Sequence, residues 1–348
     1  MELANGDYPY IPGLLYCLTV AILSHATSSF AIWSPLMWAL FYSILITNVF
    51  VLPRGLIPGV SFCSYQLMGS AVAVMGVLVE VPLLSHLPLI LAIATMPYVL
   101  VVFSGLWLGR ALQLDEGLAA MIESGAACCG RDTISITAGR IDSEEVTFRA
   151  ATSCIAVISL LATMVVAFLI TRTPLSQLIA GRADVLSLVV GSSIPEVPYL
   201  VAALNTSGFF SLGQSLTVKA VRVFVTVPVI RWIFERFREE QYSTKMSAPR
   251  SSTPWYVWGF MLSTLLGYIL NAYAPNMGAL GSLWGAARSS LSGFALPLLT
   301  TVGLAGVGSQ MKFRDMGELG LRQLMFGLSM LMILSASTIM IIVLSTSQ

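Results

Sequence analysis

Long uncharged runs alternate with short charged segments along the whole chain. Runs of more than twenty residues without Asp, Glu, Lys or Arg include 8–53, 56–79, 81–109, 197–218, 251–287, 289–311 and 323–348. A helix needs about 20 predominantly apolar residues to cross the hydrocarbon core of a bilayer. A membrane β-barrel would instead show short segments of alternating hydrophobicity. The pattern therefore predicts an all-α polytopic membrane protein.

Turn residues and charges divide these runs into about 11 membrane segments. The predicted segments are 11–27, 32–51, 61–80, 87–109, 116–140, 146–170, 184–205, 213–235, 255–272, 289–309 and 321–345. We expect one membrane domain over residues 1–348, with an N-terminal half (residues 1–171), a C-terminal half (residues 172–348) and a hydrophilic cytoplasmic loop at 236–254. Two segments, 116–140 and 184–205, contain interruptions and are either broken crossings or re-entrant hairpins.

The two alternatives for these segments predict different internal symmetry. If both segments cross, they run in the same direction, and 289–309, with Pro297 and several glycines, is the better inverted-repeat mate for 116–140. If both are hairpins, they enter from opposite faces and are mates of each other. An inverted repeat is expected in either case, and the sequence leaves the choice open.

Loop charges orient the chain, because cytoplasmic loops carry an excess of Lys and Arg. With a cytoplasmic N-terminus and eleven crossings, the outer loops receive only Arg140, Arg149 and Arg288. We therefore expect a multi-pass protein of the cell membrane with its C-terminus outside. Treating both interrupted segments as hairpins moves only the loops beside 146–170, and each carries two arginines, so charge does not separate the alternatives.

Composition agrees with this class and narrows the partners. The 348 residues are 56% hydrophobic and only 10% charged, against about 25% charged in a typical soluble domain. The net charge of +1 gives no reason to expect a nucleic-acid partner. The five cysteines lack the spacing of a metal site, so we expect no cofactor and no disulfide framework.

Charged residues remain at membrane depth once the loops are set aside. They are Arg131, Asp132, Glu196, Lys219 and Arg222, with Glu123 a weaker sixth case. A charge at the bilayer centre costs at least about 2.5–3.5 kcal/mol on insertion scales. These residues therefore either pair with one another or serve a function.

The stretch "GAACCGRDTIS" at 125–135 predicts a broken helix. Gly125 and Gly130 bracket two cysteines, and glycine is unfavourable inside a helix but tolerates positive φ. A second half-helix is expected to begin near Arg131, with Asp132 or Thr133 capping its free amides.

The stretch "GSSIPEVP" at 191–198 repeats this logic with other residues. Gly191 is expected to end one half-helix, Ser192 or Ser193 to cap the next, and Pro195 to take its first position. Glu196 then falls in the first turn. Two interrupted helices in one apolar bundle are a pointer to a transporter binding site.

A half-helix N-terminus carries partial positive charge and suits an anion. Lys219 and Arg222 are three residues apart and share one helix face. The predicted substrate site comprises Gly130, Arg131, Asp132, Ser192, Ser193, Glu196, Lys219 and Arg222. Its cations bind the anion, its serines donate hydrogen bonds, and its carboxylates provide coupling or structure.

Structural explanations compete with this one for the same residues. Arg131 and Asp132 would form an ion pair that fastens the break. Glu196 would cap its own half-helix and pair with Lys219 or Arg222, and these two cations would otherwise extend to the headgroups.

Ordered local motifs from about residue 100 to 330 resemble the YeiH-like sulfate exporter family of bacterial membrane proteins. The matching stretches are "LGRALQLDEGLAAMI" at 108–122, "GAACCG" at 125–130, "GSSIPEV" at 191–197, "VKAVRV" at 218–223 and "VGSQMKFRDM" at 307–316. The resemblance implies an anion transporter of the broad bile-acid and arsenite transporter superfamily. It covers Gly125, Cys129, Gly130, Ser193, Glu196, Lys219 and Arg222.

The chain departs from the family pattern at the expected site. Arg131, Asp132 and Thr133 replace the usual Ala-Ser-Ala, Pro195 replaces a His, and Tyr199 replaces a Gln. Sulfate is therefore only one candidate beside sulfonates and carboxylates.

We expect a secondary transporter, with export as its direction, that moves a small anion by alternating access coupled to H+ or Na+. The sequence contains no GxxxxGK[ST] motif, which would have indicated ATP hydrolysis. An anion channel is the alternative. An intramembrane enzyme has less support, because HExxH and GxSxG are absent. A homodimer is compatible with this class.

Overall fold

The computed structural model describes residues 9–30, 33–79, 87–141, 143–172, 183–207, 211–222, 255–274, 278–312 and 320–346. All regular structure in these ranges is helical. The expected cytoplasmic loop 236–254 and most of segment 213–235 lie outside them.

Six helices of the described chain are long and apolar enough to cross a membrane. They are Ile11–Ser28 (α1), Arg54–Leu78, Pro88–Ala111 within α5 (Leu87–Ala111), Glu145–Leu169 within α8 (Glu145–Arg172), Ala279–Ser309 and Leu321–Ser345 within α17 (Leu321–Thr346). Helix α2 (Pro35–Val49) is apolar but shorter. The all-helical membrane class is confirmed, whereas the total of eleven segments stays a prediction.

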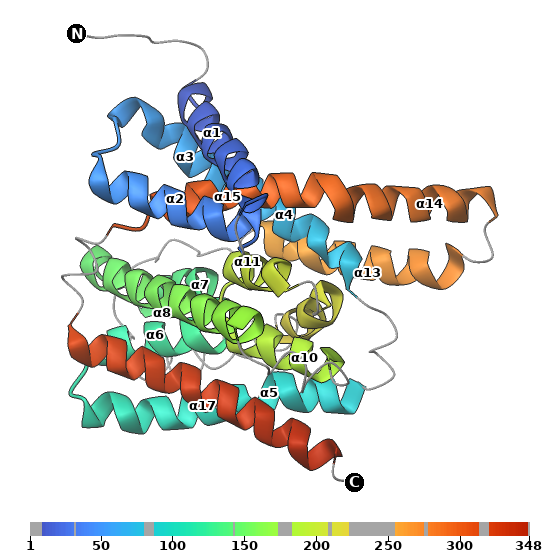
Figure 1. The fold of residues 1–348 in the computed structure, drawn as a ribbon. Helices are drawn as coiled ribbons and strands as arrows, with labels where there is room; N and C mark the ends of the chain where they lie inside the picture. The colour runs from blue at the N-terminus through green and yellow to red at the C-terminus, as the bar shows by residue number, and fades with distance from the viewer. Residues whose placement is uncertain are drawn as a thin grey trace.

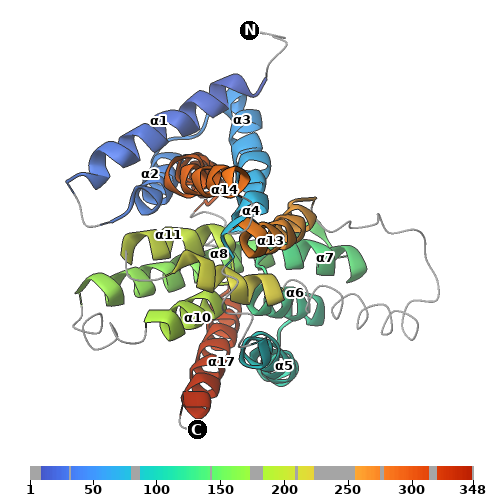
Figure 2. The same ribbon diagram turned by 90° about the vertical axis from the view of Figure 1, so that its right-hand side faces the viewer.

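The helices form two modules that lie one above the other in two perpendicular views (Figures 1 and 2). The first module contains α1, α2, the helix Arg54–Leu78, α13 (Trp255–Tyr273), α14 (Ala279–Ser290) and α15 (Leu296–Ser309). The second contains α5, α6 (Glu116–Ala127), α7 (Arg131–Ile141), α8, α10 (Ala183–Ser193), α11 (Val197–Ser207), the helix 212–222 and α17. Each module combines helices from both halves of the chain.

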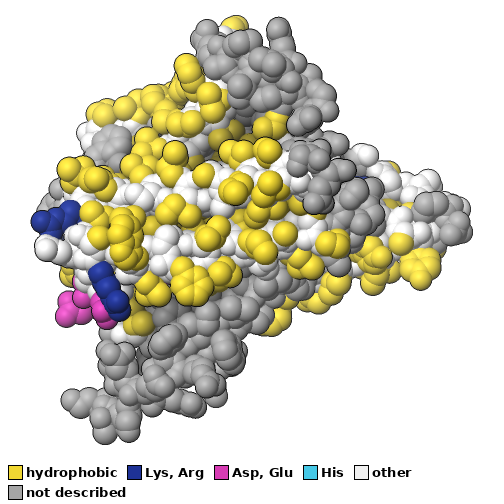
Figure 3. Space-filling model, turned by 90° about the horizontal axis from the view of Figure 1, so that it is seen from below, with side chains coloured by type: hydrophobic (Ala, Val, Ile, Leu, Met, Phe, Trp, Pro, Cys, Tyr) yellow, Lys and Arg dark blue, Asp and Glu magenta, His cyan; other side chains and the backbone are white. Residues whose placement is uncertain are grey.

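The outer face of the second module is broadly apolar. α5 and α17 expose large hydrophobic side chains, among them Phe103, Trp107, Met332 and Met340. Seen from below, hydrophobic side chains cover much of the described surface, with Lys, Arg, Asp and Glu near one edge (Figure 3). Such a face has no favourable partner in water and suits lipid.

Segment 289–309 is not broken at its glycines. The chain is helical from Ala279 to Ser309, with a π-helical stretch at Leu291–Ala295. Pro297 lies in the first turn of α15, directly after the π-helical stretch, within this continuous helix. The glycines lie inside α15, which packs on α2 and on the helix Arg54–Leu78.

Segment 116–140 is a helical hairpin. Thr137 of α7 donates a hydrogen bond of 2.9 Å to the Ser124 hydroxyl of α6. In one straight helix these residues would lie about 20 Å apart. The chain therefore doubles back at residues 128–130, and the hairpin alternative is the one the structure supports.

Segment 184–205 also reverses. Ser211 N donates to Ser187 Oγ, and Ser215 Oγ donates to the Ser187 carbonyl, so the helix 212–222 starts beside α10 and runs parallel to it. Lys219 and Arg222 then contact the end of α10. After α10 ends at Ser193, the chain has to run back to the level of Ser187 before residue 211. α11 lies in this returning part.

The two hairpins enter from opposite ends of α17. In the first hairpin, Ile122 lies against α17 at Gly327. In the second, Leu188 clusters with Ile342, and Ser192 bonds Thr338 at 2.8 Å. Both hairpins therefore point toward the middle of α17, and their tips meet there.

Candidate functional site

The first hairpin tip is a tight turn around Gly130. Gly130 has φ of 62°, a region that L side chains rarely adopt, and its N–H donates to the Gly125 carbonyl at 3.0 Å. Gly125 itself remains inside α6. The predicted break and the start of α7 at Arg131 are confirmed, and the break is confined to residues 128–130.

The cap of α7 comes from the other hairpin. The Arg131 N–H donates to Glu196 Oε1 at 3.3 Å, and Glu196 is buried. A Cβ at Gly130 would overlap the Glu196 side chain. The prediction that Asp132 caps α7 is wrong, since Asp132 accepts from Tyr256 and a carboxylate 65 residues away takes the positive end of the helix. Thr133 does contribute at this helix start, because its Oγ1 accepts from the Cys129 N–H at 3.1 Å.

The second hairpin tip is built differently from its prediction. α10 continues through Gly191, Ser192 and Ser193, and α11 begins at Val197 with Pro195 outside it. The prediction that a serine caps α11 is wrong. Ser192 is buried and its hydroxyl contacts Thr338 and Arg222, whereas Ser193 is only half-buried.

Lys219 and Arg222 hold the end of α10. Lys219 Nζ donates to the carbonyls of Ile194 and Pro195, the latter at 2.8 Å. Arg222 Nη1 donates to the Ser192 carbonyl at 3.0 Å, and Nη2 to its hydroxyl at 2.7 Å. The shared helix face is confirmed. The extension to headgroups is wrong, because both side chains are fully buried.

The cations therefore satisfy a helix C-terminus rather than a carboxylate. The last carbonyls of a helix lack partners and carry partial negative charge. Among the described residues, no cation of the site lies within 4.0 Å of Asp132 or Glu196, so the expected ion pairs are not formed. In the same region of the chain, Arg222 Nε is buried without a hydrogen-bond partner.

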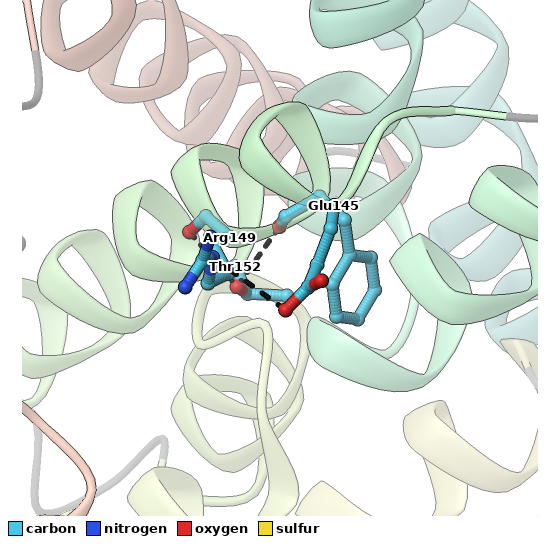
Figure 4. Close-up of polar contacts among 4 residues, drawn as sticks. Glu145, Arg149 and Thr152 are labelled. Carbon is cyan, nitrogen blue, oxygen red and sulfur yellow. Dashed lines mark hydrogen bonds and ion pairs between the residues drawn. The ribbon is translucent and has the colours of Figure 1, made fainter.

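The described residues do contain an exposed ion pair on α8. Glu145 and Arg149 approach to 3.9 Å in the exposed first turns of α8, beside Thr152 (Figure 4). Such exposed pairs contribute about 0–1 kcal/mol. Arg149 thus provides a matched control for the buried arginines.

Arg131 and Asp132 face the first module. Arg131 Nη1 donates to Gln310 Oε1 at 3.0 Å, and Gln310 Nε2 donates to Ser64 Oγ at 2.6 Å. The Tyr256 hydroxyl of α13 donates to Asp132. The dipeptide that departs from the family pattern thus joins the hairpin tip to the opposite module.

The site predicted by sequence lacks four residues that take part in polar contacts between the modules: Ser64, Gln310, Tyr199 and Tyr256. Gln310 lies in the matched stretch "VGSQMKFRDM", which is a usable signal. Tyr199 stands out in the sequence only as a departure from the family pattern, and its hydroxyl donates to Met311 Sδ at 3.0 Å. Tyr256 carries no signal, because nothing local to α13 indicates the distant Asp132.

Cys128 and Cys129 lie at the first tip with their sulfurs 3.4 Å apart. All five cysteines are free thiols. Within the described ranges, no group of three His, Cys, Asp or Glu side chains could hold a metal ion.

A cavity of about 930 Å³ separates the modules at the end where α10 enters. Polar residues on its wall include His25, Asn205, Ser211, Arg288, Ser292 and Thr300. Its described lining contains no Asp or Glu. The polar groups of the described lining are therefore cationic or neutral, and apolar residues such as Leu36, Met75 and Leu204 make up much of the rest.

Comparison with known proteins places the chain in a family. A family profile described as "Conserved hypothetical protein 698" matches residues 12–327. The chain belongs to this family. The resemblance to the YeiH-like family is thereby confirmed.

Members of the family align along most of the chain. A UPF0324 membrane protein of Corynebacterium glutamicum is 25% identical, covering 90% of this chain and 86% of its own. One of Lactiplantibacillus plantarum is 23% identical, covering 96% and 97%. UPF0324 membrane protein YdhF of Lactococcus lactis is 24% identical, covering 92% and 94%. No solved structure matches.

Proposed function

We propose that the protein is a secondary transporter of a small anion such as sulfate, a sulfonate or a carboxylate. The observation that carries the proposal is that two hairpins enter from opposite ends and their tips meet. The buried charged residues Glu196, Lys219 and Arg222 lie at this meeting point. Irregular backbone at membrane depth is tolerated where it is buried in protein or lines a cavity. Interrupted helices that supply helix ends to a ligand are typical of secondary transporters.

In the proposed site, the anion binds at the start of α7. The Arg131 guanidinium and the Gly130–Arg131 backbone are its principal contacts, with Ser193 at the second tip. Lys219 and Arg222 contribute positive potential while holding α10, and Ser192 supports Arg222. Glu196 occupies the helix N-terminus in this state and leaves it when the anion arrives.

Alternating access would follow from movement of the second module against the first. Between the modules, Arg131, Asp132 and Tyr199 supply specific polar contacts that can break and re-form. The interlocked tips favour a carrier over a channel. We propose no catalytic activity, an inverted repeat that relates the hairpins, export coupled to H+ or Na+, and an orientation with the N-terminus in the cytoplasm.

The test combines binding with transport. Purified protein is screened by thermal shift against oxyanions, sulfonates and carboxylates, because a ligand at 100 times its Kd stabilises by about 2.7 kcal/mol. The anion with the largest shift is then assayed in proteoliposomes. Arg131→Ala and Glu196→Gln are expected to abolish its flux, and Arg149→Ala to leave it unchanged. Normal flux in both site variants would overturn the proposed site.

A further inference from the structure

Glu123 is a buried carboxylate that the proposed site does not use. It lies on α6 in a cluster of apolar side chains from α5, α6, α8 and α17, including Val101, Ile122 and Phe326. Only 9% of Glu123 is exposed. Within the described chain, no hydrogen bond or ion pair of its side chain is formed, which distinguishes it from Asp132 and Glu196.

The backbone of α5 is shaped to receive this side chain. A Cβ at Gly105 would overlap Cγ, Cδ and Oε2 of Glu123. Glycine at this position therefore lets the carboxyl group lie directly on α5. A side chain that was merely tolerated would not require such a notch.

The surroundings offer Glu123 no compensating charge. The titratable groups nearby are Tyr98 of α5, Cys128 at the end of α6 and Cys154 of α8. α17 faces this cluster with Phe326, Met330 and Leu334, which are apolar. α7 contacts α6 through Ile134 and Thr137, and its charged residues Arg131 and Asp132 bond the first module. An isolated ionised carboxylate is very costly in such a place, so the neutral acid is the form that fits.

Glu123 also lies on the arm that carries the site. From Glu123, α6 continues for four residues, about 6 Å, to Ala127, and the turn at 128–130 follows directly. If the hairpin shifts along α5, the carboxyl group leaves the Gly105 notch and becomes hydrated, which permits loss of the proton. Proton binding and hairpin position are then linked, since each form of Glu123 is compatible with one position.

We propose that Glu123 is a proton-binding site that couples protonation to the position of the α6–α7 hairpin. The assignment of a role in transport rests on the proposed function, whereas proton binding at Glu123 does not. It names H+ as the coupling ion. Glu116, an exposed carboxylate at the start of the same helix, is the matched control.

The first measurement is labelling of the full-length protein by dicyclohexylcarbodiimide, which reacts with protonated carboxyl groups in apolar surroundings. Peptide mass spectrometry is expected to find the adduct on Glu123, decreasing as pH rises, and none on Glu116. Absence of the adduct on Glu123 across the range from mildly acidic to mildly alkaline pH would overturn the proton site, whatever the outcome of the transport assays.

The second measurement uses Cys129, the half-buried cysteine at the hairpin tip, as a reporter. Its alkylation by N-ethylmaleimide is followed against pH in wild-type protein, Glu123→Gln and Glu116→Gln. The ratio of wild type to Glu123→Gln is expected to change severalfold between mildly acidic and mildly alkaline pH, and the ratio of wild type to Glu116→Gln to stay constant. A constant ratio for both variants would overturn the coupling. Because no substrate is used, this outcome is distinguishable from failure of the proposed anion site.

Discussion

At each hairpin tip, charged side chains bind the free backbone groups of a helix end: a carboxylate at the start of α7, and two cations at the end of α10. The second tip, at residues 194–196, is held by Lys219 and Arg222 of its own module. The first tip, at residues 128–132, is held by Glu196 and by side chains of the first module. The second tip is therefore an internal element of the second module, whereas the first is a joint between modules.

Because of this difference, we expect substitutions at the two tips to affect different properties of the protein. Removing an internal hydrogen-bond donor leaves buried carbonyls unsatisfied, and that penalty falls on the folded state as a whole. Breaking a contact at the joint removes a bond between the two modules and leaves the packing within each module in place. We therefore expect large effects on unfolding at the second tip and large effects on transport at the first.

The largest loss of stability is expected for Arg222→Ala. The substitution removes two hydrogen bonds from a buried guanidinium and should lower the free energy of unfolding by about 3 kcal/mol. Denaturation in detergent measures the change. Arg149→Ala, which removes an exposed arginine, should cost less than about 0.5 kcal/mol. Equal losses in the two variants would contradict the internal role of Arg222.

An intermediate effect is expected for Gly130→Ala. Positive φ costs a non-glycine residue about 1–2 kcal/mol, and the added methyl group overlaps Glu196. Shortening the neighbour in Gly130→Ala/Glu196→Ala should recover the steric cost and leave the conformational cost. A double-mutant cycle measures this coupling, and strict additivity would show that the two tips do not press on each other.

The smallest effect on stability is expected at the joint. Gln310→Ala removes the hydrogen bonds of Gln310 to the half-buried Arg131 and to Ser64 and should cost about 1–2 kcal/mol. It should nevertheless change the flux of the transported anion severalfold, because the contact forms in one position of the modules. Tyr256→Phe should behave alike through Asp132. Wild-type flux in both variants would show that the contacts of Arg131 and Asp132 with the first module play no part in transport.

Local patterns predicted which segments are helical and where the first hairpin breaks. Two glycines around Cys128-Cys129 were enough to place the start of α7, because glycine disfavours helix interiors and permits positive φ. The same reasoning failed at residues 191–195. Gly191 stayed within α10, since its missing side chain admits the backbone of Ser215 rather than ending the helix.

The partners of the charged residues could not be predicted from the sequence. The salt bridges expected from the sequence paired Arg131 with its neighbour Asp132. They also paired Glu196 with Lys219 or Arg222. In the structure, Lys219 and Arg222 bind carbonyls, Glu196 accepts from an amide, and Arg131 donates to Gln310. Helix ends are strong partners for charge, but their positions are known only once the chain has folded.

By itself, the sequence determined that the chain is a helical membrane protein with charged groups at two interruptions. Hydropathy and helix-breaking residues act locally, so they can be interpreted without knowing the fold. Only the tertiary structure decided that both interruptions reverse the chain, that their tips meet, and that Arg131 and Asp132 bridge two modules. These outcomes depend on which helix ends face each other across the bundle, and residues far apart in sequence decide that together.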